Sequence, residues 1–428
     1  MRLFAEIRVD SGVMEEACIY RMEKKMETLA IHGGNPVRDT KLFYGHQYID
    51  DADVAAVTQV LRSDYLTCGP KITELEQRLC ELTGSRYAVV CSNGTAALHI
   101  ACQAAGAGAG DEVITTPITF AASANCALYC GAKPVFADIN PATYNIDPES
   151  VKAHMTQATK AVVAVDFTGQ AVELDALTAL CEEQSNKTGK KVYLIEDGAH
   201  SIGTKYNGKG VGSIADMTTF SFHPVKTVTG GEGGAVLTNS KELYDKLVLY
   251  RAHGITRMPE FMEHTPDGPW YYEQIGLGTN YRMTDIQAAL IISQLDKLPM
   301  FSARRKEIVA RYNEAFSKMP ELFVQQEIPQ SDTTRHLYIL RICPDKLNID
   351  RAGFFAAMGA ENICCNVHYI PVYYHPYYEH LGYECGLCPH AEKLYDEMMS
   401  LPLYYGMTDT DVEDVIAAVK KIVDYYRK

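Results

Sequence analysis

The sequence contains no stretch of about 20 continuous apolar residues, the length that a membrane-spanning helix requires. Its first 30 residues mix charged and apolar positions, without the unbroken apolar run and small-residue cleavage site that a signal peptide carries. We therefore expect a cytoplasmic protein with no membrane contact. We also expect residues 1–40 to form a loosely held N-terminal arm.

Positive charge is in deficit, because 40 lysines and arginines face 54 aspartates and glutamates, and the formal net charge is -14. A surface of this sign repels the phosphate backbone of nucleic acids and anionic membranes. We expect no nucleic-acid partner. An anionic substrate would need a local basic patch set against this background.

The sequence also lacks the full ligand pattern of a structural zinc site. Cys385 and Cys388 form a C-x-x-C between His380 and His390, but no second C-x-x-C is present. The 13 cysteines are scattered, which in a chain without an export signal favours reduced thiols. The pattern favours ordinary thiols and no bound metal, with zinc as the open alternative.

Internal repeats and low-complexity linkers are absent, whereas 47% of the residues are hydrophobic, enough for a large core in two or three domains. Seven short apolar runs alternate with helical patterns between Tyr87 and Asn239. The runs are YAVVC (87–91), EVITT (112–116), KPVFADI (133–139), KAVVAVDF (160–167), KVYLIED (191–197), MTTFSF (217–222) and GGAVLT (233–238). Buried runs joined by helices indicate a mostly parallel sheet with helices on both faces.

The pattern changes in the last third of the chain. Residues 284–319 look helical throughout, with a break expected at Pro299. The runs HLYILRI (336–342) and NICCNVHYI (362–370) flank a helix expected around 350–359. We expect a large domain over 41–283, followed by a connecting helix and a small α+β domain over 284–428. The segment from Gly254 to Gly278 is expected to be a long loop.

One lysine follows the end of a predicted strand and precedes a run of glycines. Lys226 lies in TFSFHPVK (219–226), followed by TGGEGG (229–234). Glycines let a backbone approach a ligand closely, and Ser221 offers a hydroxyl. A lysine that forms an imine must sit in a cleft and lose its proton readily, which desolvation favours. A solvated surface lysine is the alternative.

A carboxylate ends another apolar run. Asp197 follows VYLI (192–195) and precedes Gly-Ala-His200. Open α/β sheets bind ligands at the carboxyl ends of their strands. A carboxylate there can keep the ring nitrogen of pyridoxal phosphate (PLP) protonated, which makes the ring an electron sink. The alternative is that Asp197 caps the next helix.

Three weaker signals fit the same kind of site. The turn SNGTAAL (92–98) joins a strand to a helix, whose free backbone N–H groups can bind phosphate, although it matches no Walker or G-x-G-x-x-G pattern. Phe120 could stack on a flat ring or could belong to the core. Asn280 precedes the long helix and, taken alone, is a loop or capping residue.

Together these residues resemble one family, the DegT/DnrJ/StrS sugar-nucleotide aminotransferases. The resemblance runs from about Phe43 to the C-terminus. It rests on the ordered segments SNGTAALH, TPITFAASAN, VDFTGQ, IEDGAHSIG, SFHPVKTVTGGEGGA, RAHG and NYRMTDIQAALIISQL. It implies an aspartate-aminotransferase-like (fold type I) PLP enzyme, with a large, mostly parallel mixed sheet flanked by helices and a smaller α+β C-terminal domain.

The resemblance also implies roles for individual residues. Lys226 matches the Schiff-base lysine and Asp197 the partner of the pyridine nitrogen. The other implied cofactor contacts are Gly94, Thr95 and Ser221 at the phosphate, Phe120 on the ring, His200 beside the ring oxygen where many members carry Gln, and Asn280 from the neighbouring subunit. A shared site of this kind implies a homodimer.

Within the family, the chain looks most like a branch that aminates C4 of a UDP-linked 4-keto-6-deoxy-N-acetylaminosugar. Its product is UDP-4-amino-4,6-dideoxy-N-acetyl-β-L-altrosamine, on the way to pseudaminic acid. Glutamate is the expected amino donor. The implied substrate contacts are Tyr44, Asp64, Tyr65, Leu66, Thr67, Val367, His368, Tyr369 and Ile370. Arg251 and His253 are further candidates for basic contacts with an anionic substrate.

Three alternatives stay open at this point. The first is an aminotransferase for a different UDP- or dTDP-linked 4-keto or 3-keto sugar. The second is a sugar dehydratase on the same scaffold, although related dehydratases carry histidine where Lys226 stands here. The third is a PLP-binding regulator without catalysis, against which the net charge argues if DNA is its target.

Overall fold

The computed structural model describes residues 28–428, so most of the expected N-terminal arm, residues 1–27, lies outside the described part. The arm's remaining residues pack on the C-terminal part of the chain. Leu29 is fully buried, and the backbone N–H groups of Ala30 and Val37 donate to the carboxylate of Glu361 at 3.0 and 2.8 Å. Among the described residues, no helix is long and apolar enough to cross a membrane.

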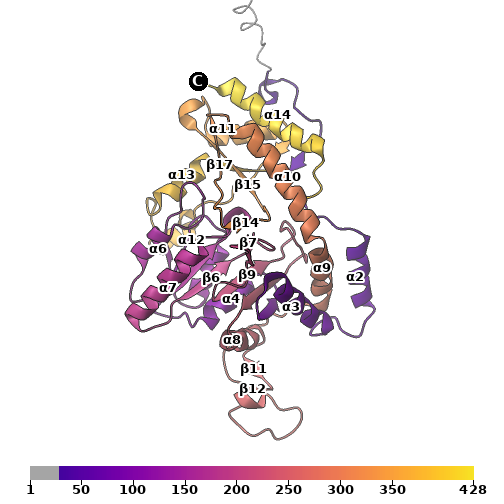
Figure 1. Cartoon of the computed structure of the whole chain (residues 1–428), viewed down its shortest axis with the longest axis vertical. Coiled ribbons are helices and arrows are strands. Elements are labelled where there is room, and N and C mark those ends of the chain that lie inside the picture. Colours follow the sequence, from indigo (N-terminus) through magenta and orange to yellow (C-terminus); the bar gives the residue numbers. More distant parts are fainter. Residues whose placement is uncertain (1–27) are drawn as a thin grey trace, which may run out of the picture.

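A seven-stranded sheet lies at the centre of the larger part of the molecule (Figure 1). Its order is β2-β10-β9-β6-β5-β3-β4. The strands are β2 (Tyr87–Cys91), β3 (Glu112–Thr115), β4 (Lys133–Phe136), β5 (Thr159–Val165), β6 (Tyr193–Asp197), β9 (Met217–Ser221) and β10 (Gly234–Thr238). Strand β10 runs antiparallel to both neighbours, and the remaining pairs are parallel. All seven apolar runs form strands of this one sheet, which confirms the predicted mostly parallel sheet.

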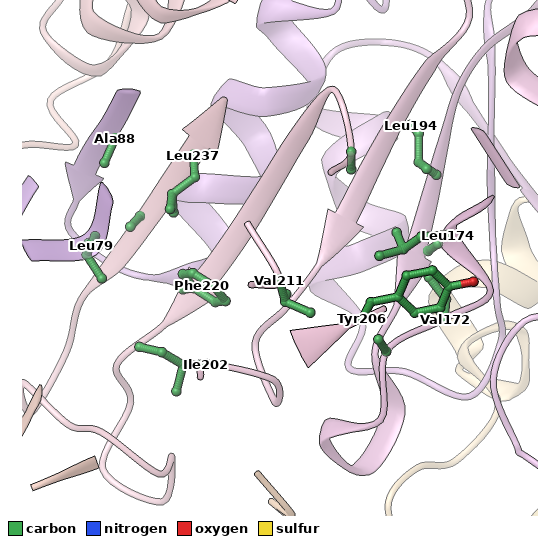
Figure 2. Close-up of a cluster of buried hydrophobic side chains, with 14 of the residues drawn as sticks. Leu79, Ala88, Val172, Leu174, Leu194, Ile202, Tyr206, Val211, Phe220 and Leu237 are labelled. Atoms are coloured by element: carbon green, nitrogen blue, oxygen red, sulfur yellow. The ribbon is translucent and has the colours of Figure 1, made fainter. Parts of the chain in front are cut away.

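Helices cover both faces of the sheet because successive strand residues point to opposite sides. Ala88 and Val90 face one buried cluster, whereas Val89 and Cys91 face the other. The first cluster includes α3 (Pro70–Thr83), α7 (Leu174–Thr188) and α9 (Asp285–Asp296), and the second includes α4 (Gly94–Ala104), α5 (Ala122–Tyr129) and α8 (Lys241–Arg251). Figure 2 shows part of the first cluster.

A pair of helices leads to the second, smaller group of elements. Helix α9 ends at Asp296, with Lys297 as its C-cap, and α10 (Leu298–Phe316) has Pro299 in its first turn, where a missing N–H costs nothing. The predicted break is confirmed. Beyond it, β13 (Leu322–Val324), β15 (Tyr338–Ile342) and β17 (Met398–Leu401) form a sheet, packed with α11 (Arg351–Ala360) and α14 (Asp409–Tyr426) around a separate core.

Two segments differ from the sequence-based expectation. Only Ile363–Cys364 of the run 362–370 forms a strand, β16, which pairs with β1 (Leu42–Phe43). The segment 254–278 is a projecting hairpin rather than a plain loop, since β11 (Ile255–Thr256) pairs with β12 (Glu273–Gln274) (Figure 1). The carboxylate of Glu273 organises it by accepting hydrogen bonds from the N–H groups of Glu263 and His264.

The other elements are short connections around these layers. They are α2 (Asp51–Leu61), α6 (Pro148–His154), α12 (Pro376–His380), α13 (Pro389–Glu397), β7 (Lys205–Tyr206), β8 (Lys209–Gly210), β14 (Ser331–Asp332) and the 3-10 turns Ala30–His32, Phe167–Gly169, Pro259–Phe261, Pro344–Lys346 and Val372–Tyr374. Residues 366–369, after β16, return to the edge of the large sheet, where Val367 and Tyr369 pack against a cluster that includes Phe136 and Phe167.

Candidate active site

A cavity of about 590 Å³ opens at the carboxyl ends of the central strands. Asp197 is the last residue of β6, Ser221 is the last residue of β9, and Gly94 begins the helix that follows β2. The cavity also receives residues from the C-terminal part of the chain. The sequence-predicted residues that line it are Tyr44, Gly94, Thr95, Phe120, Asp197, His200, Ser221, Lys226, Val367, His368 and Tyr369.

Asp197 is buried at the floor of this cavity. Its Oδ2 accepts a hydrogen bond of 2.6 Å from the Ser123 hydroxyl, and its Oδ1 accepts one of 3.1 Å from the Ala199 N–H. Burial raises the pKa of Asp197, while these two hydrogen bonds and the charge of Lys226 partly offset that rise. Asp197 is therefore held in a fixed orientation, with unused acceptor capacity on its two oxygens.

Lys226 lies in the loop after β9, where its backbone N–H donates to the His223 carbonyl at 2.9 Å. Desolvation lowers the pKa of its amine to about 8, against the attraction of Asp197, which raises it. At neutral pH a minor fraction of this amine is already unprotonated, far more than for an ordinary lysine. An amine in this condition can act as a nucleophile and as a base.

The N-terminus of α4 forms a cradle opposite Ser221. Asn93 caps the helix by accepting from the Ala96 N–H at 2.8 Å, so the amides of the first helical residues, Gly94 and Thr95, have no intrahelical acceptor. A Cβ on Gly94 would lie 2.9 Å from the Ser221 Cβ and 3.0 Å from its Oγ. Only glycine allows α4 to approach β9 this closely, which brings the free amides of Gly94 and Thr95 beside the Ser221 hydroxyl, a donor set that suits a phosphate.

Aromatic and imidazole side chains line the rest of the cavity. Phe120 is 63% exposed, so it is not a core residue, and its ring centroid lies 6.4 Å from that of Tyr369. The Tyr369 hydroxyl lies 3.2 Å from His200 Nε2, and His368 Nδ1 lies 2.7 Å from the Ser400 hydroxyl. Burial lowers the pKa of His368 to about 4, and it also lowers the pKa of His200 well below its usual range. These imidazoles are neutral at physiological pH.

The single chain does not bring every predicted residue to the cavity. Asp64, Tyr65, Leu66, Thr67, Asn280 and Ile370 are exposed and lie outside it. Backbone bridges fix two of these residues in place. Thr67 pairs with Thr284, and Asn280 pairs with Ala252. Arg251 also lies elsewhere, bound to Glu76 at 2.8 Å and to the Val90 carbonyl at 2.9 Å.

Ser123 is a site residue that the sequence pattern did not reveal. It lies inside the small-residue helix α5, where a serine resembles its alanine neighbours in the sequence. Its hydroxyl bridges Thr119 Oγ1 at 2.7 Å and Asp197 Oδ2.

The comparison with known proteins agrees with this geometry. The model of the DegT/DnrJ/EryC1/StrS aminotransferase family matches residues 47–420. The chain belongs to this family. It is therefore a PLP-dependent aminotransferase of fold type I, and the sequence-based recognition of the family, its fold and its cofactor is confirmed.

Individual relatives span nearly the whole chain. The spore coat polysaccharide biosynthesis protein SpsC of Bacillus subtilis is 39% identical over 388 residues, 90% of this chain and 98% of its own length. A UDP-4-amino-4,6-dideoxy-N-acetyl-β-L-altrosamine transaminase of Campylobacter jejuni is 36% identical over 388 residues, 90% of this chain and 98% of its own length.

Solved structures show the same fold. The Helicobacter pylori PseC structure, an aminotransferase involved in the biosynthesis of pseudoaminic acid, superimposes with a TM-score of 0.82 at 30% identity, covering 90% of this chain and 100% of PseC. The PLP form of Spr1654 from Streptococcus pneumoniae has a TM-score of 0.83 at 30% identity, covering 90% of this chain and 99% of Spr1654.

The residues around the cavity fit the family's cofactor. The free amides of Gly94 and Thr95 line the cavity beside the Ser221 hydroxyl and suit a phosphate, and the exposed face of Phe120 suits a flat ring. The chemistry of the donor set agrees, because the same cavity holds the carboxylate of Asp197 and the partly desolvated amine of Lys226.

Proposed function

We propose that the chain transfers an amino group from L-glutamate to C4 of a UDP-linked 4-keto-6-deoxy-N-acetylaminosugar. The product would be UDP-4-amino-4,6-dideoxy-N-acetyl-β-L-altrosamine or a close analogue. The observation that carries the proposal is one cavity that joins Lys226 and Asp197 to two tyrosines, Tyr44 after β1 and Tyr369 after β16. The names of the two Campylobacter relatives, 36% and 35% identical, support the choice of sugar.

In this proposal each side chain has a defined task at the cofactor. When bound, PLP supplies an electron sink for the carbanion formed at the amino-bearing carbon. Asp197 holds the proton on the ring nitrogen, and Ser123 fixes the orientation of its carboxylate. Lys226 Nζ would hold the cofactor covalently between reactions. Once free, it takes the proton from the donor's α-carbon and returns a proton to the sugar's C4, which a pKa near 8 suits.

The phosphate and the ring are held by the other cavity residues. The Gly94 and Thr95 amides and the Ser221 hydroxyl would bind the phosphate, and Phe120 would cover one face of the ring. On the substrate side, Tyr44 and residues 367–369 would contact the sugar, because they line the cavity from the segments that follow the paired strands β1 and β16.

We propose a homodimer with shared active sites for the predicted residues that the single chain leaves outside. Asn280 and residues 64–67 are exposed, and so is Ile370, which is 41% exposed. In an isologous dimer such residues can complete the partner's cavity. The projecting hairpin β11–β12 exposes Trp270 (68%) and Tyr272 (52%), aromatic groups of the kind that interfaces cover.

A second candidate is an aminotransferase for another UDP- or dTDP-linked keto sugar. The specific observation in its favour is that SpsC, a spore coat polysaccharide protein, is 39% identical to the chain, slightly more than the altrosamine transaminases. The two candidate reactions would use the same residues at the cofactor. They differ only in the sugar and the nucleotide of the substrate.

A substrate panel separates these candidates. The purified chain with PLP and glutamate is assayed against matched 4-keto sugars linked to UDP and to dTDP, each with and without a 2-N-acetyl group. Product is measured by mass, with Lys226→Ala as the inactive control. We expect the highest kcat/KM for the UDP-linked N-acetyl sugar. A higher kcat/KM for a dTDP-linked sugar, or for one without the acetamido group, would contradict the proposal.

A further inference from the structure

A second histidine lies directly behind His200, on the side away from the cavity. The His200 and His336 ring centroids are 4.5 Å apart, with an interplanar angle of 42°. His336 is buried, and its backbone is fixed at both ends. Its N–H donates to the Thr168 carbonyl at 2.8 Å, and its carbonyl accepts from Arg305 Nη1 at 3.1 Å. The backbone of His336 is therefore fixed, and its ring packs against that of His200.

The hydrogen bonds of the two rings are unequal. His200 Nε2 faces the Tyr369 hydroxyl at 3.2 Å. The Nδ1 atoms of His200 and His336 are both buried and have no hydrogen-bond partner among residues 28–428. An orphaned buried N–H is rarer in proteins than an under-satisfied acceptor, so a bare Nδ1 is favoured over one that carries a hydrogen. This places the single ring hydrogen of a neutral His200 on Nε2.

The direction of the next hydrogen bond follows from that tautomer. A His200 Nε2–H donates to the Tyr369 oxygen, so the hydrogen of the tyrosine hydroxyl is free to point elsewhere. Tyr369 lines the cavity, and burial raises the pKa of its hydroxyl, which stays protonated. The remaining direction for the Tyr369 hydrogen is toward an acceptor oxygen of a ligand in the cavity.

The surrounding charges keep both rings neutral. Burial lowers the pKa of His200, and the nearby Lys226 and His368 lower it further. Burial likewise lowers the pKa of His336. Its neighbours His200, Lys226, Arg305 and His368 lower that pKa further. Every cationic group that faces the pair therefore opposes its protonation.

We propose that His336 is a positioning residue. Its ring packs against that of His200, holds the His200 hydrogen on Nε2, and so makes Tyr369 a hydrogen-bond donor to an oxygen of the bound ligand. The identity of that oxygen rests on the proposed function, because it belongs either to the ring hydroxyl of PLP or to the keto sugar. The tautomer and the role of His336 do not depend on the sugar.

The direct test is the tautomer of His200 in the full chain labelled with ¹⁵N-histidine, with the His200 signals assigned from His200→Gln. We expect Nε2 to carry the hydrogen and Nδ1 to be bare. His336→Phe keeps the covering ring and should retain this tautomer, whereas His336→Ala admits water to Nδ1 and should populate the other tautomer or the protonated ring. His154→Phe, on the distant helix α6, is the control and should change nothing.

Several results would overturn the proposal. These are a hydrogen on Nδ1 in the unaltered chain, a His336→Ala variant with the original tautomer, or a His336→Phe variant that loses it. The measurement on the unaltered chain stands even if a variant does not fold. No sugar is needed, so a failure of the substrate panel leaves this test intact.

A second set of variants identifies the oxygen that Tyr369 contacts. If it belongs to PLP, Tyr369→Phe should shift the pH dependence of the visible spectrum of the bound cofactor. If it belongs to the sugar, the spectrum should stay unchanged while KM for the sugar rises about tenfold, the cost of one lost hydrogen bond. His336→Ala should give the same signature, and the double variant should be no worse than Tyr369→Phe. Additive losses, or neither signature, would contradict the coupling of the two residues.

Discussion

Gly94→Ala tests the phosphate cradle with the addition of a single methyl group. The new Cβ would lie 2.9 Å from Ser221 Cβ, 3.0 Å from Ser221 Oγ and 3.5 Å from Ser221 Cα, so α4 must move away from β9. Overpacking of this kind costs about 1 to 3 kcal/mol. Because the displaced amides are those that would bind the phosphate, we expect PLP to bind about 5 to 150 times more weakly.

The measurement is the dissociation constant of PLP for the full chain, followed by absorbance at increasing cofactor concentration. Gly359→Ala is the matched control, because Gly359 is an exposed helical residue whose added Cβ meets nothing within 4 Å. It should leave PLP affinity unchanged and stabilise α11 by up to about 1 kcal/mol. Ser221→Gly alone measures the cost of losing the hydroxyl, and the double variant, in which the steric conflict is removed, should bind PLP about as tightly as Ser221→Gly. If Gly94→Ala binds PLP as tightly as the unaltered chain, the cradle is not where the phosphate lies.

Four further predictions follow from the cavity and the sheet beneath it. Lys226→Ala should still bind PLP non-covalently but show no turnover, and near-normal activity would disprove its role. Asp197→Asn should slow proton abstraction by about a hundredfold or more, and a loss below tenfold would argue against its contact with the ring nitrogen. Burial raises the pKa of Glu196 to about 7, and that of the adjacent Asp166 also rises. The stability that this buried pair contributes is present at low pH and is lost as pH rises through 7. The free energy of unfolding should therefore fall between pH 6 and 8. It should fall less in Glu196→Gln, which does not titrate at this position. Mixed Lys226→Ala and Asn280→Ala subunits should regain activity that neither variant shows alone, and no recovery after subunit exchange would refute the shared site.

The sequence predicted the central sheet and the cofactor side of the cavity well, for a physical reason. Buried strands of a parallel sheet are continuous apolar runs, and their carboxyl ends meet at one edge. Asp197 and Ser221 could therefore be placed together from strand ends alone. The interruption between α9 and α10 was predictable because Pro299 has no N–H.

The parts that the sequence did not reveal depend on contacts between distant segments. Ser123 contacts Asp197, which is 74 positions away, and His336 contacts His200, which is 136 positions away. No local sequence pattern marks such pairs. The run 362–370 is apolar enough for a strand, but only Ile363–Cys364 finds a partner strand. Exposed predicted residues such as Asn280 have a role only if a second copy of the chain is present.

The most direct test of the account is the visible spectrum of the full chain with PLP. We predict a yellow protein whose absorbance is lost on addition of L-glutamate and returns when a UDP-linked 4-keto N-acetylaminosugar is added. This result requires Lys226 and Asp197 to act on one cofactor in one cavity. A protein that stays colourless with PLP, or one whose spectrum ignores glutamate and every keto sugar, would contradict the account.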